Sequence, residues 1–351
     1  MKLRSTYEFA LAAPTSMGVR LTPEGRSAVQ VSDHFLLQAT SAETNVMNVA
    51  SSLGMSCVAL TRFVKDSPVA AFIKRSLRSR GIRYMGPEID QGGPWGYRHQ
   101  FNIADAGCGL RAPRVWNDRT GELGQTLIAS DYKPEELFGR RGVGILHISG
   151  LIAALSAATG QACLELARAA RKYGTLVSFD LNFRASFWQG RKQELKEIFQ
   201  AIAAEADILT SIDVIEGTPD DFQPMPLEEK AERFKRIISR AQCKYPKAQM
   251  FMMSLRETIS AEEHRLGALL WDGEWKEIFP QYIPVRDRIG GGDALVGGVL
   301  YGLLQGWTSE QALQFGWASA VMASESEKDY VEPADEKQVW DIYHGNALVQ
   351  R

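Results

Sequence analysis

From about residue 144 onward, short apolar runs alternate with longer amphipathic stretches. Apolar runs of this length are typical of buried strands, and the stretches between them repeat apolar residues with a helical period. An alternation of strands and helices favours a largely parallel sheet covered by helices. The pattern predicts strands at residues 144–149, 176–180, 208–209 and 250–255, with helices at 161–173 and 227–241.

Two further regions extend this pattern. Residues 265–271 and 274–279 flank Asp272-Gly273, and Asp-Gly between two extended runs is a strong hairpin signal. The sheet is therefore expected to be mixed at one edge. Upstream, residues 43–53 and 68–80 have helical periodicity and enclose a strand at 57–61. We expect a single α/β domain over residues 1–351.

The segment from 92 to 127 has a different character. It is rich in glycine, lacks a helical period and contains extended stretches at 97–103 and 114–117. Together with extended segments in about residues 9–38, it predicts a small β-sheet set apart from the main sheet, as a lid. Because there is no internal repeat or low-complexity linker, this lid would be formed by excursions from one core.

Charge and hydropathy exclude several classes of protein. The 351 residues carry a formal net charge of -2, which gives no general attraction to nucleic acid or to an anionic membrane. No stretch approaches the ~20 apolar residues needed to span a bilayer, and the N-terminus lacks a signal-peptide core. We therefore expect a cytoplasmic protein with reduced cysteines that acts on small molecules.

Three familiar site patterns are absent. The four cysteines form no CxxC pair and the five histidines no HExxH motif, so we expect no metal held by protein side chains alone. No Walker A sequence occurs, which argues against a P-loop kinase. No GxGxxG follows an early strand with an acid about 20 residues later, which argues against a dinucleotide-dependent dehydrogenase.

The most informative stretch is DRIGGGDALVGG, residues 287–298. Gly290, Gly291 and Gly292 precede Asp293, after which an apolar helical pattern begins. Glycines let main-chain amides approach a phosphate oxygen, and a helix N-terminus adds about half a positive charge. An ionised Asp293 at this anion site could take the proton of an attacking hydroxyl. The alternative is a tightly packed helix start, where Asp293 satisfies backbone donors.

Four segments resemble the ribokinase (PfkB) family. Residues 287–307, DRIGGGDALVGGVLYGLLQGW, resemble its C-terminal DTxGAGD signature and small-residue helix. More narrowly, residues 41–54, 111–119 and 178–188 are similar to segments of the family's 2-keto-3-deoxygluconate kinases. The segments occur in family order over about residues 40–325, so the joint match is much more specific than any one of them.

The resemblance implies an α/β fold, a ribokinase-like three-layer α/β/α sandwich with a small β-sheet lid that often mediates dimerisation. It implies a carbohydrate kinase that uses ATP and Mg²⁺ to phosphorylate a sugar acid, 2-keto-3-deoxygluconate, as a homodimer or higher homo-oligomer. Asp293 falls on the family's catalytic base, and Gly290, Gly291 and Gly292 fall on its anion hole. The implied substrate-binding residues are Ser41, Asn45, Arg98, Asn117, Arg119 and Arg184, and the implied nucleotide-binding residues are Ser211, Arg256 and Ser260.

The arginines suit an acidic sugar because a planar guanidinium binds a carboxylate through two hydrogen bonds. Each has a structural alternative: Arg119 could pair with Asp118 or Glu122, and Arg184 could bond to strand-end carbonyls. Arg98 stands where the family has a tyrosine, with Tyr97 one residue away on the opposite face of a strand. Of the aromatic residues near Arg184, Phe187 and Trp188 are expected in the core.

Two departures from the family bear on activity. Thr40-Ser41 replaces a di-glycine before the first helix, which narrows the sugar wall or offers new hydrogen bonds. After residue 210 the family's NxxE, whose glutamate organises water around magnesium, reads Ser211-Ile212-Asp213-Val214. Asp213 or Glu216 could substitute, although neither has the expected spacing.

Three functions remain open at this stage. The first is an ATP-dependent kinase for 2-keto-3-deoxygluconate or a close sugar acid. The second is a ribokinase-fold protein that binds sugar or nucleotide with weak or no phosphorylation, which the departures favour and the retained Asp293 opposes. The third is a kinase for a neutral sugar such as fructose, for which Arg98 and Arg119 would be unnecessary.

Overall fold

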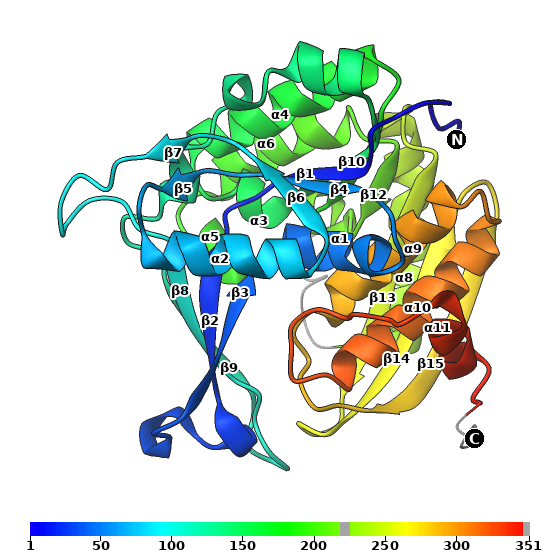
Figure 1. Ribbon diagram of the computed structural model, residues 1–351. Helices are drawn as coiled ribbons and strands as arrows, with labels where there is room; N and C mark the ends of the chain where they lie inside the picture. The colour runs from blue at the N-terminus through cyan, green and yellow to red at the C-terminus, as the bar shows by residue number, and fades with distance from the viewer. Residues whose placement is uncertain (218–224, 347–351) are drawn as a thin grey trace.

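The computed structural model describes residues 1–217 and 225–346 (Figure 1). Within these ranges the main feature is a sheet of nine strands. Their order across the sheet is β15 (Trp275–Pro284), β14 (Glu263–Trp271), β13 (Met250–Thr258), β12 (Ile208–Thr210), β11 (Leu176–Asp180), β10 (Val143–Ser149), β1 (Phe9–Pro14), β4 (Cys57–Leu60) and β6 (Ile82–Met85).

The topology of this sheet confirms the prediction of βα units with a mixed edge. The strands from β13 to β6 pair in parallel, whereas β14 and β15 form an antiparallel hairpin that follows β13. One boundary differs from the prediction. Residues 9–14 form β1 between β10 and β4, so they belong to the large sheet and not to the small one. Their uninterrupted burial is typical of a central parallel strand.

A second, smaller sheet stands away from the body of the molecule (Figure 1). In the described residues it has four strands in the order β3 (Phe35–Thr40), β2 (Gly18–Pro23), β8 (Gln100–Asp105) and β9 (Arg114–Asp118). The register places one row of residues across each face of the sheet. Gln38, Arg20, Asn102 and Asn117 form one row, and Leu37, Leu21, Ile103 and Trp116 form a row on the opposite face.

Helices cover both faces of the large sheet and create two cores. Ile145 and Met252 pack with α1, α2, α9, α10 and α11, whereas their neighbours Leu146 and Phe251 pack with α4, α6 and α8. No helix in the described ranges combines the length and the apolar character that crossing a bilayer requires. The helices are α1 (Ala42–Ser52), α2 (Pro68–Ser79), α3 (Gly150–Ala153), α4 (Ala157–Lys172), α5 (Ala185–Trp188), α6 (Lys192–Ala203), α7 (Asp213–Glu216), α8 (Leu227–Lys244), α9 (Gly291–Leu304), α10 (Ser309–Ser324) and α11 (Glu336–Tyr343).

Short elements complete the chain. β5 (Phe63–Val64) pairs with β7 (Glu88–Ile89), and a π-helical turn spans Glu135–Arg141. The 3-10 turns are Glu24–Arg26, Val29–Val31, Leu123–Thr126 and Ala129–Tyr132.

Helix α9 lies unusually close to its neighbours because glycines face them. A Cβ at Gly297 would lie 2.4 Å from the carbonyl oxygen of Val46 in α1, and one at Gly298 would lie 2.6 Å from Cα of Gly316 in α10. Real Cβ atoms do not approach other atoms so closely, so only glycine permits this packing. The close approach fixes the start of α9 relative to α1.

Candidate active site

A cavity of about 760 Å³ lies between the two sheets. Its walls come from the carboxyl ends of β11 and β12, the starts of α1 and α9, the hairpin β14–β15 and the inner row of the small sheet. Ligand sites of open α/β sheets lie outside the carboxyl ends of the strands, as this cavity does. Of the residues that the sequence singled out, it brings together Ser41, Asn45, Asn117, Arg119, Arg184, Ser211, Arg256, Gly290, Gly291, Gly292 and Asp293.

The turn before α9 has the conformation that its glycines predict. Gly290 precedes the helix with φ 86°, and a Cβ there would lie 1.9 Å from the Asp329 carbonyl oxygen. A side chain is therefore excluded at this position. The amides of Gly291, Gly292 and Asp293 donate to no acceptor within residues 1–217 and 225–346. Three amide donors without acceptors at a helix N-terminus have the geometry that anion binding requires.

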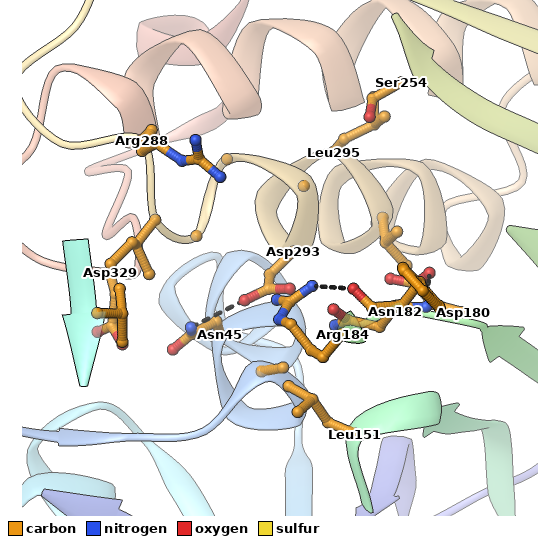
Figure 2. Close-up of a pocket in the computed structure, with 18 of the residues that line it drawn as sticks. Asn45, Leu151, Asp180, Asn182, Arg184, Ser254, Arg288, Asp293, Leu295 and Asp329 are labelled. Carbon is orange, nitrogen blue, oxygen red and sulfur yellow. Dashed lines mark hydrogen bonds between the residues drawn. The ribbon is translucent and has the colours of Figure 1, made fainter. Parts of the chain in front are cut away.

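Asp293 is the third residue of α9 and faces the cavity. Its Oδ2 accepts a hydrogen bond of 2.9 Å from Nδ2 of Asn45 in α1, so a side chain of the neighbouring helix orients the carboxyl group. Figure 2 shows Asp293 with Asn45 and Arg184 beside it. A first-turn acid that only satisfied backbone donors would not need this partner.

The expectation that Asp293 stays ionised needs correction. Burial, together with the nearby charges of Asp180 and Asp329, raises the pKa of Asp293 to about 8, although Asn45 and Arg184 act in the opposite direction. With this pKa the ligand-free carboxyl group is largely protonated at neutral pH. A pKa near the working pH is suited to a group that accepts and releases a proton.

Three arginines line the cavity without a carboxylate partner in the described ranges: Arg184, Arg256 and Arg288. Arg184 donates one hydrogen bond of 2.9 Å to the carbonyl of Phe183, as its structural alternative predicted, and keeps its charge unpaired. Burial and the charges of Arg288 and Arg184 lower the pKa of Arg256 to about 10. Arginines that disfavour one another's charge need an anion between them, so this end of the cavity suits phosphate groups.

At the small sheet the arginine is already paired. Nη1 of Arg119 donates to both carboxylate oxygens of the buried Glu122, at 2.8 and 3.0 Å. Its guanidinium lies over the ring of Phe187, 5.2 Å from the centroid. Phe187 therefore belongs to the cavity wall and not only to the core. Trp188 packs against Phe199, as expected for a core residue.

Two of the sequence-derived site residues lie away from the cavity lining. Arg98 lies just before β8, where it donates to the carbonyl of Thr120 at 2.5 Å and pairs with Asp118. Ser260 lies in the turn between β13 and β14, where its hydroxyl accepts the amide of Glu262 at 3.1 Å. Both side chains form hydrogen bonds to other residues of the protein and do not line the cavity.

The residues that replace the di-glycine use their hydroxyl groups within the protein. Ser41 caps α1 by accepting the amide of Thr44 at 3.1 Å, and Thr40 donates to the carboxylate of Asp329. Both hydroxyls are therefore already engaged within the protein. The replacement of the di-glycine by Thr40-Ser41 was expected either to narrow the wall of the sugar site or to offer new hydrogen bonds. These internal hydrogen bonds favour the first of the two effects.

The acids considered as substitutes for the missing glutamate are engaged elsewhere. Asp213 pairs with Arg233 at 3.0 Å, and Glu216 accepts Tyr245 Oη and Lys244 Nζ at 2.6 Å each. No group of three His, Cys, Asp or Glu side chains suited to a metal exists in the described ranges. The carboxylates that do line the cavity, Asp180, Asp293 and Asp329, fit a Mg²⁺ ion only if phosphate oxygens supply most of its ligands.

Sequence reasoning missed several lining residues. Asp180, whose pKa burial raises to about 6, ends the strand that was predicted at 176–180, and Arg288 lies inside the glycine-rich motif, so both had a local signal. Arg20 and Asp329 are distant in sequence from every motif, and only the fold brings them to the cavity.

Comparisons with known proteins agree with this geometry. A model described as pfkB family carbohydrate kinase matches residues 266–335. A 5-dehydro-2-deoxygluconokinase of Clostridium perfringens is 29% identical over 177 residues, which is 50% of this chain and 47% of the relative, so the match spans about half the relative's length. A 2-dehydro-3-deoxygalactonokinase of Haloferax volcanii is 26% identical over 314 residues, 87% of each chain.

Solved structures show the same fold. The 2-dehydro-3-deoxygluconokinase of Thermotoga maritima has a TM-score of 0.85 at 21% identity and covers 97% of this chain and 99% of its own. A candidate ribokinase II of E. coli, solved with ATP and Mg²⁺, has a TM-score of 0.74 at 13% identity and covers 96% and 99%. The sheets have the ribokinase-like arrangement, and residues 266–335 are similar to the pfkB family of carbohydrate kinases.

Proposed function

We propose that this protein transfers the γ-phosphoryl group of ATP to a hydroxyl of a keto-deoxy sugar acid, with 2-keto-3-deoxygluconate as the first substrate to test. The relatives named above act on sugar acids of this kind, which supports the substrate class. The observation that carries the proposal is Asp293: a carboxyl group with a pKa of about 8 lies beside three main-chain amides without partners.

The geometry supports a division of roles around the phosphoryl group. The amides of Gly291 and Gly292 would hold its oxygens, and Arg184 would neutralise charge as the bond to the leaving group breaks. Asp293, oriented by Asn45, would accept the proton of the attacking hydroxyl. Mg²⁺ would enter with ATP and neutralise the charge of its phosphates.

Nucleotide binding is proposed for the side of the cavity that carries Ser211, Arg256 and Arg288. Ser211 follows β12 with φ 57°, and its amide donates to the carbonyl of Met252 at 3.0 Å, so the turn is fixed. Asn117 and Arg119 of the small sheet line the opposite side, where the sugar acid would bind.

A homodimer is proposed through the outer face of the small sheet. Trp116 and Leu37, in the row that faces away from the cavity row, keep 46% and 44% of their surface exposed. Exposed apolar side chains that share one face support an interaction surface. Light scattering after size exclusion, on wild type and Trp116→Lys, would show a dimer that the variant weakens; a monomeric wild type would contradict the proposal.

A coupled ADP-release screen tests the catalytic proposal. Keto-deoxy sugar acids, aldoses and ketoses would be offered with Mg·ATP to wild type, to Asp293→Asn and to Asp90→Asn, an exposed surface control. We expect release with a sugar acid, a loss of at least ~10²-fold in kcat for Asp293→Asn with nearly unchanged binding, and no change in the control. Equal turnover of Asp293→Asn and wild type would overturn the role of Asp293.

Two observations favour the other functions that the sequence left open. Neither Asp213 nor Glu216 reaches the cavity, which favours a binding protein; calorimetric binding of ATP or sugar without ADP release would identify it. Arg119 is neutralised by Glu122, which favours a neutral sugar; release with fructose and not with sugar acids would identify that activity.

A further inference from the structure

Arg20 of β2 is the largest fully buried polar side chain near the cavity, with 1% of its surface exposed. It pairs with the carboxylate of Asp287, which precedes the glycine turn. The other oxygen of Asp287 accepts the amide of Ile289 at 3.0 Å. A continuous chain of bonds therefore runs from the small sheet to the residue that adjoins Gly290.

The small sheet also holds the other side of the turn. Nε2 of Gln38 donates to the Glu327 carbonyl at 3.0 Å, and the amide of Asp329 donates to Oε1 of Gln38 at 3.3 Å. Thr40 donates to the carboxylate of Asp329. The carbonyl of Asp329 is the group that closes the space at Gly290. Strands β2 and β3 thus form hydrogen bonds to the segments on both sides of the turn.

Folding free energy does not explain this use of Arg20. Nε and Nη1 of Arg20 are buried and have no hydrogen-bond partner in the described ranges. A buried guanidinium that meets its partner through one nitrogen loses more hydration than the pair returns, and apolar residues of similar volume often serve stability as well. A role other than stability is therefore needed to explain the pair of Arg20 and Asp287. Its position suggests one, because the pair connects the small sheet to the glycine turn.

We propose that Arg20 is a positioning residue that couples the small sheet to the turn carrying the free amides and Asp293. The proposal rests on the kinase function proposed above. Through Asp287 it holds Ile289 and hence Gly290 in the conformation that points the amides into the cavity. A sugar that binds against the small sheet then acts on the phosphate end of the cavity through the same bonds.

A double substitution separates positioning from stability. Arg20→Met with Asp287→Leu replaces the ion pair by apolar side chains and removes the acceptor of the Ile289 amide. We expect a free energy of unfolding close to that of wild type, kcat lower by roughly 30-fold and KM for ATP changed less than about threefold. The matched control is Arg62→Met with Asp131→Leu, a pair at 2.6 Å outside the cavity lining, which should leave kcat unchanged.

Asp287→Asn is the conservative variant, and it also serves if the double variant does not fold. It retains an oxygen for the Ile289 amide while losing the charge, so kcat should fall by less than tenfold. The same kcat in wild type, the double variant and Asp287→Asn would overturn the proposal, as would equal losses in the Arg62 control.

Amide hydrogen exchange gives a readout that does not require activity. In Arg20→Met, exchange of the Asp287 and Ile289 amides, which donate to the Ser324 carbonyl and to the Asp287 carboxylate, should be at least tenfold faster than in wild type, while β10 and β11 keep their protection. Unchanged exchange of these two amides would refute the coupling. If wild type released no ADP, the kinase proposal would fail, and this measurement would still decide whether Arg20 holds the turn.

Discussion

The two ends of the cavity use arginine in opposite ways. At the start of α9, Arg184, Arg256 and Arg288 lie together without a carboxylate partner in the described residues. At the small sheet, Arg20 and Arg119 each pair with a buried acid, Asp287 and Glu122. One end therefore holds uncompensated positive charge, whereas the other end is close to neutral.

This difference teaches where binding free energy and folding free energy come from. Unpaired arginines destabilise one another until an anion arrives, so their charge is available for a ligand. The charge of a paired arginine is already neutralised by a carboxylate of the protein. Such an arginine holds its surroundings in position more than it attracts a charged ligand. The cavity is thus suited to a ligand whose charge is concentrated at one end, as in a triphosphate.

The largest effect is expected for stability at the paired end. Arg119→Met would leave the carboxylate of Glu122 buried without its partner, which should lower the free energy of unfolding by about 3 kcal/mol. Arg288→Met, at the unpaired end, should leave the free energy of unfolding unchanged or raise it. Urea denaturation at pH 7 measures both; equal losses would remove the distinction between the two ends.

The next largest effect concerns nucleotide affinity. Removing two unpaired charges in Arg256→Met with Arg288→Met should raise KM for ATP by roughly 50-fold and change KM for the sugar little. Initial rates at varied ATP and fixed sugar test this. A larger change in KM for the sugar than for ATP would show that the two ends have been assigned the wrong way round.

The pH dependence sharpens the account of the unpaired end. Because the pKa of Asp293 is about 8, the ionised base grows about tenfold between pH 7 and pH 9, and kcat/KM for the sugar should rise with it. A kcat/KM that is flat from pH 6 to 9 would contradict Asp293 as the titrating base.

The last prediction concerns how the ionisation of Asp293 changes the free energy of unfolding of the protein. The pKa of Asp293 is higher in the folded chain than its ordinary 3.8, so the unfolded chain loses the proton first and stability declines as the pH rises from about 4 to 8. Asn cannot ionise, so the stability of Asp293→Asn relative to wild type should rise as the pH is raised from 4 to 8. Thermal melts at the two pH values check the difference.

Sequence periodicity predicted the fold better than it predicted the site. The strand at 176–180 coincides with β11, and the Asp-Gly hairpin coincides with β14 and β15, because both signals are local. Residues 9–14 were grouped with the small sheet because a short buried strand carries no mark of the sheet that it joins.

The site was predictable where a motif carries its own geometry. The glycine turn needs no distant residue to define it, and it lies at the cavity as its sequence indicated. Arg98 was placed at the substrate by alignment, but its neighbours Asp118 and Thr120 bind it outside. The protonation of Asp293 depends on burial and on Asp180 and Asp329, which no local pattern contains.

The missing side chain at Gly297 has a consequence for how the activity of this protein could be adjusted. Gly297 lies one helical turn after Asp293 and touches the residue next to Asn45, the partner of Asp293. A methyl group added there would push α1 and α9 apart and lengthen the hydrogen bond from Asn45 that orients Asp293. Directed evolution could thus change catalytic rate from a position that no substrate ever meets.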